Sequence, residues 1–298
     1  MRHKLFITIL LSAAPVFAQV QNASTGLTFL KLGVGGRAIG MGEAYSAISN
    51  DAAGMYYNPA GIATGSGDEI TFMHKDWVFG TAIEYLGAVV QTGNFALGFG
   101  LNSTNVDNIE IRQQPGPSLG TFGLHDLAIS GTASWRVDTA LSIGATGKFL
   151  YEKILVDETS GAAFDVGAKY QVNRNIALAA AISNIGSTSE LASESITLPT
   201  TFRFGGSYSS DAAGEFGYTF AADILKVPQD TGTRLHIGAE TVYEAFLSFR
   251  AGYQFGYDAK GYSAGLGVHY GLLQFDYAFV PFLDDLGNTH TFALTFNL

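Results

Sequence analysis

The feature that most constrains this fold is an alternation of large apolar residues with small or polar ones, repeated from Glu69 to the end of the chain. In residues 94–102, for example, every second residue is Phe or Leu, and the residues between them are Asn, Ala or Gly. Successive strand side chains point to opposite faces, so each such segment has one bulky apolar face and one small or polar face. About fourteen of these segments follow one another, each near the roughly 9–11 residues that a tilted membrane strand needs. The pattern predicts an all-β protein.

Alternation alone fits both a soluble β-sandwich and a membrane barrel, because each buries one face of its strands. Three features favour the barrel. Only 14% of the residues are charged, against roughly 25% in soluble domains, and aromatic residues gather near strand ends, where a membrane girdle lies. Short turns also alternate with longer connections, which is typical of outer-membrane barrels. We expect the longer connections at residues 103–124, 153–162, 186–200, 225–232 and 281–288. Residues 66–298 are therefore predicted to form a transmembrane antiparallel up-and-down β-barrel of about 14 strands.

The start of the chain predicts export. Arg2 and Lys4 precede an apolar run, and a small-residue cleavage site ends at Ala18, as in a secretory signal peptide. We expect residues 1–18 to be this peptide and the mature chain to begin near Gln19. No run approaches the about 18 consecutive apolar residues of a membrane helix, so a closed barrel is the expected means of spanning a membrane. The predicted location is the outer membrane of a Gram-negative cell, in contact with outer-membrane lipids.

Residues 19–65 form a Gly-rich stretch without the strand pattern. Asp51 is a good N-cap for a short helical turn, and Asn58 can cap a second turn that has Pro59 at its first position. A barrel of this size has an interior that is open to water unless it is filled, and this stretch is available to fill it. We therefore predict that residues 19–65 form an N-terminal plug, or hatch. Its motif residues are Arg37, Glu43, Asp51, Asn58, Pro59, Ala60 and Gly61.

Charged residues of both signs occur on the small or polar face of the predicted strands. One interpretation is a network of ion pairs between wall and plug, which a polar lumen tolerates; the other is a substrate path. We favour the network, with Arg37 and Glu43 as the natural plug partners. The predicted lumen charges are Glu84, Asp126, Arg136, Lys148, Asp165, Lys169, Arg203, Arg250 and Asp276, together with Asp223, Arg234 and Glu240.

Enzyme and nucleic-acid functions find little support. Residues 33–38 match a dinucleotide fingerprint, and residues 261–265 match the nucleophile elbow of hydrolases, but both motifs need a strand-to-helix turn that the pattern does not predict here. Cys is absent, and the His residues lie singly without metal-ligand spacing. A net charge of −10 argues against a nucleic-acid partner. We expect no enzymatic activity, no cofactor and no metal site.

The N-terminal motifs resemble a known family. Residues 29–38, 40–45, 50–52 and 58–61 together are similar to the start of PorV/PorQ-type outer-membrane proteins, which belong to the FadL-like β-barrel superfamily. That superfamily has fourteen strands and an N-terminal hatch. The resemblance implies a non-enzymatic component of protein secretion or surface attachment, of type IX kind, with secretion-machinery or cargo proteins as partners. The alternative is a FadL-like uptake channel that binds a hydrophobic small molecule. A scaffold should copurify with proteins, whereas a channel should copurify with a lipid-like ligand.

Overall fold

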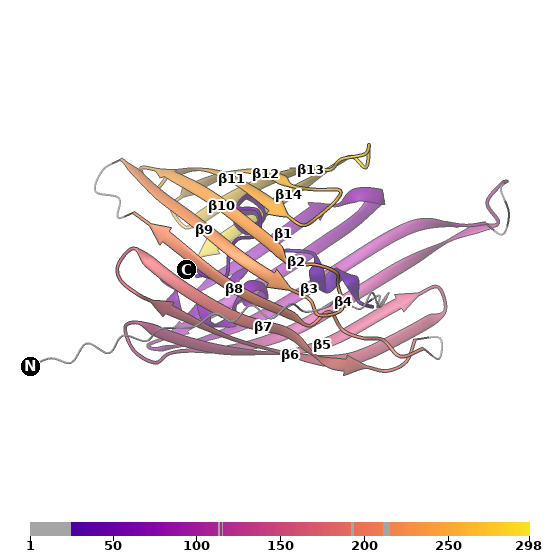
Figure 1. Ribbon diagram of the computed structural model, residues 1–298, viewed down its shortest axis with the longest axis horizontal. Coiled ribbons are helices and arrows are strands. Elements are labelled where there is room, and N and C mark those ends of the chain that lie inside the picture. The colour runs from indigo at the N-terminus through magenta and orange to yellow at the C-terminus, as the bar shows by residue number, and fades with distance from the viewer. Residues whose placement is uncertain (1–24, 113, 115, 192–193, 211–214) are drawn as a thin grey trace, which may run out of the picture.

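A closed ring of strands dominates the computed structural model, which describes residues 25–298 except 113, 115, 192–193 and 211–214 (Figure 1). The expected signal peptide, residues 1–18, lies outside the described residues. The strands are β1 Glu69–Asp76, β2 Thr81–Thr92, β3 Phe95–Ile111, β4 Gly120–Arg136, β5 Leu141–Ile154, β6 Asp157–Gln171, β7 Ile176–Thr188, β8 Thr201–Ser209, β9 Phe216–Lys226, β10 Arg234–Tyr243, β11 Leu247–Phe255, β12 Tyr262–Tyr270, β13 Leu273–Pro281 and β14 Asn288–Asn297.

Each strand pairs antiparallel with its neighbours in sequence, and β1 closes the ring by pairing with β14, so that Glu69 lies opposite Asn297. This confirms the predicted up-and-down barrel of fourteen strands. Closure also leaves no exposed sheet edge. Because β1 starts where β14 ends, that end of the barrel also carries every connection after an even-numbered strand. We call it the proximal end. The connections after odd-numbered strands lie at the opposite, distal end.

The outer face of the barrel carries the large apolar side chains. Six phenylalanines spread around the ring are between 45% and 62% exposed. They are Phe72, Phe99, Phe164, Phe204, Phe220 and Phe275. The residues between them in sequence point inward, as Thr71 and Asp276 do, at 4% and 3% exposure. A continuous apolar band of this extent is far larger than soluble proteins expose, and it characterises outer-membrane barrels. The face assignment from the alternation is therefore confirmed for these strands.

Phe275 lies on this outer face, directly opposite Val268 of β12 and Leu294 of β14, and we predict that it lies near mid-membrane. Phe275→Arg should lower the free energy of unfolding by about 2–4 kcal/mol, because an arginine there faces hydrocarbon. Tyr270 lies at the proximal end of β12 and is 77% exposed, so Tyr270→Arg should cost only about 0–1 kcal/mol. Urea unfolding of both variants in phospholipid vesicles measures the difference. Equal costs at the two positions would contradict the depth assignment.

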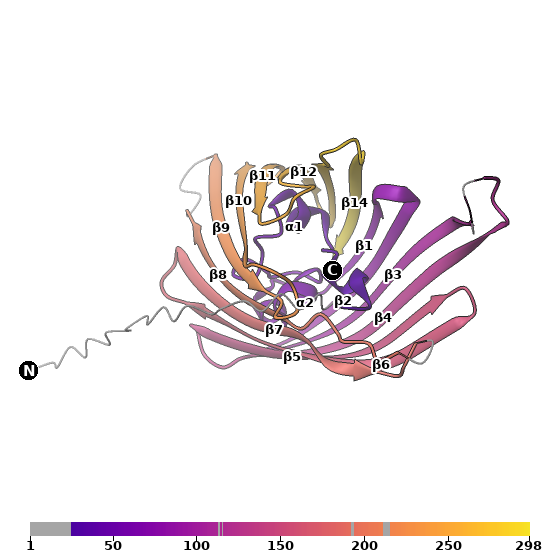
Figure 2. The ribbon, with the colours of Figure 1, turned by 45° about the vertical axis from the view of Figure 1, so that its right-hand side comes forward.

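Residues 25–64, which we call the N-terminal segment, lie inside the ring of strands (Figure 2). The segment contains the short helices η1 Thr28–Lys31, α1 Gly36–Gly40, α2 Gly54–Tyr57 and η2 Pro59–Thr64, and η3 Val78–Gly80 joins β1 to β2. None of the described helices is long and apolar enough to cross a membrane. Val34, Met41, Tyr45 and Tyr57 are completely buried. The hydrophobic core thus lies within the barrel, between this segment and the inner wall.

Two of the long connections predicted from the sequence are wrong, because most of their residues belong to strands. Residues 103–124 are mostly strand, since β3 runs to Ile111 and β4 starts at Gly120, and residues 153–162 likewise belong to β5 and β6 except at 155–156. Both faces of these stretches carry polar residues, so they extend beyond the apolar band while the strand pairing still satisfies their backbone groups. The barrel is consequently taller on this side, and the β3–β4 hairpin reaches furthest out (Figure 1). The connections after β9 and β13 fall where they were expected.

Candidate functional site

Side chains, rather than strand pairing, hold the N-terminal segment in the barrel. Within the described residues, the one backbone-to-backbone hydrogen bond between this segment and residues 66–298 joins the Gly26 nitrogen to the Thr197 oxygen, at 3.2 Å. The strand ladder itself is complete without the segment. The barrel and its contents are therefore stabilised by different interactions, and one can be altered without dismantling the other.

Glycines on the inner wall let the segment approach the strands closely. A Cβ atom at Gly252 of β11 would lie 2.1 Å from the Gly42 nitrogen, and one at Gly238 of β10 would lie 2.3 Å from the Met41 oxygen. Real Cβ atoms do not come this near to other atoms, so only glycine fits at these wall positions. The glycines of the inner face therefore leave the room that the segment's backbone occupies.

A larger residue at such a wall position should displace the segment. Gly252→Val puts a branched side chain where the Gly42 backbone lies, so we expect overpacking that costs about 1–3 kcal/mol. Hydrogen exchange at residues 40–43 should quicken while the heat-resistant migration of the barrel on gels stays normal. Gly131→Val is the matched control, since a Cβ at Gly131 meets nothing within 4 Å. Unchanged exchange in Gly252→Val would contradict the close approach.

A chain of alternating charges joins α1 to the wall. The Arg37 guanidinium donates to both Glu240 carboxylate oxygens, at 3.0 and 2.7 Å. Glu240 also accepts from Arg250 at 2.7 Å, and Arg250 donates in turn to Asp276 at 2.6 Å. Charge-assisted and bidentate pairs of this kind are among the stronger polar contacts in proteins. The expected pairing of Arg37 with a wall charge is thus present, and its partner is Glu240.

A second polar contact fixes the middle of the segment. The Asp223 carboxylate of β9 accepts from the backbone nitrogens of Tyr45 and Ser46, at 3.1 and 3.0 Å, and from the Ser46 hydroxyl at 2.7 Å. Arg203 of β8 donates to the same carboxylate at 3.1 Å and to the Glu43 carbonyl oxygen at 3.1 Å. Asp223 is completely buried, so its charge depends on these donors.

The two turns expected near Asp51 and Asn58 form as short helices. The Asn58 side-chain oxygen accepts from the Ala60 nitrogen at 3.1 Å, with Pro59 at the first helical position, which confirms the predicted cap of η2. Asp51 lies further from its helix than expected, because α2 starts only at Gly54; the Asp51 carboxylate accepts the Gly54 N–H at 2.9 Å. Local capping chemistry therefore sets both turns.

Two wall cations hold carbonyl oxygens of the segment near the proximal end. Arg136 of β4 donates to the Ala63 oxygen at 3.1 Å, and Lys169 of β6 donates to the Ser49 oxygen at 2.8 Å. Lys169 also donates to the Thr64 hydroxyl at 3.0 Å. Arg136 thus supplies a partner to one of the last carbonyls of η2, which have none within the helix, and Lys169 joins that helix end to the Ser49 carbonyl.

One predicted lumen charge is wrong. Glu84 lies on the outer face, where its side chain is 49% exposed and contacts the His74 imidazole at 2.6 Å. In β2 it is Ile83 and Tyr85 that point inward. Tyr85 does so because its hydroxyl donates to the Ala52 oxygen of the segment, at 2.8 Å. The other predicted charges do face the interior: Asp126, Arg136, Lys148, Asp165, Lys169, Arg203, Asp223, Arg234, Glu240, Arg250 and Asp276.

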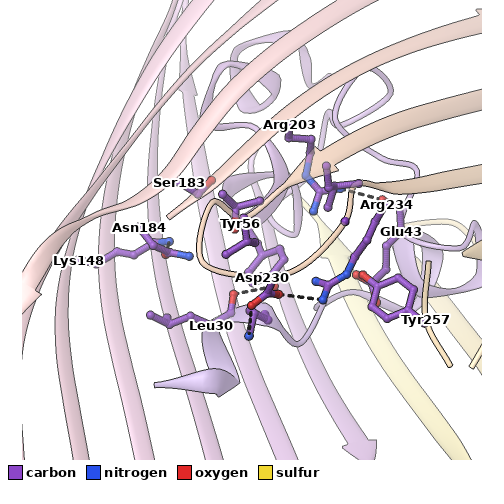
Figure 3. A pocket seen from close by; sticks show the side chains of 15 residues that line it. Leu30, Glu43, Tyr56, Lys148, Ser183, Asn184, Arg203, Asp230, Arg234 and Tyr257 are labelled. Carbon is purple, nitrogen blue, oxygen red and sulfur yellow. Dashed lines mark hydrogen bonds and ion pairs between the residues drawn. The ribbon is translucent and has the colours of Figure 1, made fainter. Parts of the chain in front are cut away.

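A cavity of about 40 Å³, the distal cavity, lies between the segment and the distal connections. Figure 3 shows Lys148 and Asn184 on one side of it, Arg234 and Tyr257 on the other, and Tyr56 between them in this view. Four cationic side chains line the cavity against two acidic ones, beside aromatic and aliphatic groups. The cations are Lys31, Lys148, Arg203 and Arg234, the acids are Glu43 and Asp230, and the apolar groups include Leu30, Tyr56, Leu225, Val227 and Tyr257.

The two acidic side chains of this cavity form ion pairs that connect the N-terminal segment with the barrel. Asp230 accepts from Arg234 at 2.8 Å and from Lys31 at 3.4 Å. Glu43 lies 3.7 Å from Lys260. Burial opposes the charge of Glu43, but the positive charges of Lys260 and other nearby basic groups lower its pKa to about 2. Glu43, predicted as a plug residue with a wall partner, therefore stays ionised at neutral pH.

A second, smaller cavity of about 30 Å³ shares Leu30, Tyr56 and Lys148 with the first and reaches Met55 and Tyr85. The Tyr56 hydroxyl donates to the Leu30 oxygen at 2.9 Å, and these two residues fill the space between the cavities. Both volumes are well below the roughly 300–1,000 Å³ of ligand pockets. Sequence reasoning missed Leu30, Tyr56 and Tyr257 as site residues, since they lie outside the strands and no alternation marks them.

The motifs dismissed from the sequence lie where the N-terminal segment contacts the wall. Ser263 of β12 points inward and donates to the Gly40 oxygen at 3.2 Å. The Gly-rich residues 33–38 lead into a five-residue helix that contacts an antiparallel barrel, not a parallel sheet. In the part of the chain that the structure describes, no three His, Cys, Asp or Glu side chains are grouped to hold a metal ion.

Comparison with known proteins identifies a family and a fold. A family model described as "Uncharacterised protein family (UPF0164)" matches residues 8–189, more than half of the chain. No curated protein matches the sequence. Solved structures with the same fold include the Ralstonia pickettii toluene transporter TbuX, 14% identical with a TM-score of 0.64, which covers 89% of this chain and 98% of its own.

Two further structures have this architecture. The CymD monoaromatic hydrocarbon channel is 15% identical with a TM-score of 0.67, over 92% of this chain and 99% of its own. The Pseudomonas putida toluene transporter TodX is 11% identical with a TM-score of 0.63, over 88% and 96%. At these identities the likeness shows the fold, a barrel of the outer-membrane type. These neighbours are transport channels rather than enzymes, whereas the resemblance to PorV/PorQ proteins rests on the sequence motifs.

Proposed function

We propose that this chain, which belongs to the uncharacterised protein family UPF0164, is an outer-membrane channel that takes up small hydrophobic or amphipathic molecules through its distal end. The observation that carries the proposal is the distal cavity, where apolar and cationic side chains line a space inside a barrel of outer-membrane type. The fold shared with toluene transporters and a hydrocarbon channel supports the same function. This proposal adopts the hydrophobic-uptake alternative in preference to a role in secretion.

The lining of the cavity suits a ligand with an apolar body and an electron-rich or anionic end. Leu30, Tyr56 and Tyr257 offer apolar and aromatic surface. Each of the four lining cations is paired with an acid, Asp230, Asp165 or Asp223, so an anionic ligand end would bind as a further partner of these cations. Cationic side chains attract carboxylates and also the faces of aromatic rings. At about 40 Å³ the cavity is filled by its own side chains, so in this proposal a ligand enters by displacing Leu30 or Tyr56.

The second candidate function is the PorV/PorQ-type role in protein secretion or surface attachment, which the motifs in residues 29–61 favour. The two candidates differ in what they bind at the distal end. A secretion component would hold an exported protein there, with the interior serving only to seal the barrel. A channel would hold a small molecule in the interior.

Equilibrium dialysis with radiolabelled toluene and radiolabelled dodecanoate, on protein held in an amphipathic polymer, tests the channel proposal. Saturable binding of at least one probe is expected. Leu30→Trp should reduce it by about tenfold or more, since an indole fills the space between the two cavities and overpacks it. The matched control is Leu283→Trp, because Leu283 is 59% exposed in the β13–β14 connection. Absence of saturable binding, with secretion proteins copurifying from native membranes, would instead support the second candidate.

A further inference from the structure

Two buried wall carboxyl groups lack the cation that every comparable acid has. Asp126 of β4 lies directly opposite Glu152 of β5 on the inner face, and the two are 4% and 6% exposed. Residues directly opposite on an antiparallel pair have Cβ atoms about 4.5–5.5 Å apart, so the two carboxyl groups lie side by side. Asp165, Asp223 and Asp276 each have a Lys or Arg nitrogen between 2.6 and 3.1 Å away. Within the described residues, no Lys, Arg or His side chain forms an ion pair with Asp126 or Glu152.

Further oxygen atoms without partners surround this pair. Asp126 Oδ1, Thr104 Oγ1 and Asn102 Oδ1 are all buried and make no hydrogen bond with the described residues. Thr104 of β3 lies directly opposite Asp126, at a spacing that brings Cβ atoms within about 4.5–5.5 Å. Asn102 is two residues away on the same face of β3 and is 7% exposed. Buried polar atoms normally have partners, so this patch of oxygens on three adjacent strands requires one.

We propose that Asp126, Glu152, Thr104 and Asn102 bind a hard divalent cation with the chemistry of Ca²⁺. The donors are exclusively oxygens from carboxylate, amide and hydroxyl groups, which is the set that Ca²⁺ prefers and that softer metals do not. Two carboxylates side by side repel each other unless a positive charge lies between them. A single shared proton, with the Thr104 hydroxyl donating to Asp126, would also relieve that repulsion, but it would supply nothing to the Asn102 oxygen. In this proposal one cation serves all four groups.

The cation would also affect the start of the N-terminal segment. Leu27 packs with Leu150 and Ala128 of the wall in a buried cluster, and Leu150 is two residues from Glu152 on the inner face of β5. A metal ion that fixes the Glu152 carboxylate would therefore hold the part of β5 that the segment contacts. This inference is independent of the proposed channel function, since it concerns only the wall and the segment.

Isothermal titration of EDTA-treated, refolded protein with CaCl2, and in parallel with MgCl2, tests the proposal. We expect one saturable Ca²⁺ site and a rise in the thermal unfolding temperature as Ca²⁺ is added. Asp126→Asn, which keeps the shape and removes the charge, should abolish binding. Thr104→Val should weaken it by about 10–100-fold, as the loss of one supporting group does at other metal sites. Asp157→Asn, in the exposed tip of the same β5–β6 hairpin, is the control and should bind like the wild type.

Three outcomes would overturn the proposal. Wild-type protein that binds neither ion would mean that the two carboxyl groups share a proton. Unchanged Ca²⁺ affinity in both Asp126→Asn and Thr104→Val would place any bound ion elsewhere. If Asp126→Asn does not assemble, Thr104→Val decides the question, because it introduces no charge change into the wall; wild-type affinity in that variant would exclude the site.

Discussion

Single-channel conductance in planar bilayers is expected to rise by about tenfold or more when residues 25–64 are deleted, because barrels of this width are open to water unless something fills them. The deletion removes the side chains that fill the interior, including Val34, Met41 and Tyr45, which are completely buried. The remaining wall presents glycine, hydroxyl and charged residues to the lumen, and these tolerate water. This experiment tests the proposal that the N-terminal segment is a plug.

Assembly of the deletion variant is verified by its heat-resistant migration on gels, which should persist because the strand ladder closes without the segment. The control is deletion of residues 155–156, the tip between β5 and β6, and it should leave the conductance at the wild-type level. If the barrel lacking residues 25–64 assembles and conducts no more than the wild type, the plug proposal fails. The wall would then have to be collapsed, or filled by its own side chains.

The second large effect is expected at Asp223. In Asp223→Asn, Arg203 loses its buried partner charge, and an amide can no longer accept from all three donors of Tyr45 and Ser46. Removal of one partner from a buried ion pair typically costs about 3–5 kcal/mol. We expect the loss to appear as local release of residues 43–50, since the barrel is held by its strand ladder. Hydrogen exchange at these amides should accelerate by about a hundredfold or more.

Asp258→Asn is the matched control, because Asp258 is exposed in the β11–β12 connection. It should leave exchange at residues 43–50 unchanged. The same measurement on β13 should also be unaffected in Asp223→Asn, which separates local release from destabilisation of the whole barrel. Wild-type exchange rates at residues 43–50 in Asp223→Asn would mean that the segment is held by its other contacts and that Asp223 contributes little.

The sequence predicted the candidate site less well than the fold, and β2 shows why. Around Glu84 the chain carries large residues at both parities, with Ile83 and Tyr85 on one face and Leu86 on the other. The period-two signal is therefore ambiguous there, and the inward position of Tyr85 follows from its hydrogen bond to Ala52. The same limit applies to Tyr56 and Leu30, whose place beside the distal cavity depends on how the segment folds within the barrel.

The sequence by itself determined the class of fold, the number of strands and the lipid-facing surface. Successive side chains of a strand alternate between the lipid-facing and the inner face, so the faces of Phe275 and Asp276 can be assigned from the residues next to them in sequence. Only the tertiary structure decided which charges pair and where space remains. Arg37 meets Glu240 across 203 positions of sequence, and Asp126 meets Glu152 but no cation among the described residues, because ring closure and the path of the N-terminal segment set distances that no local pattern encodes.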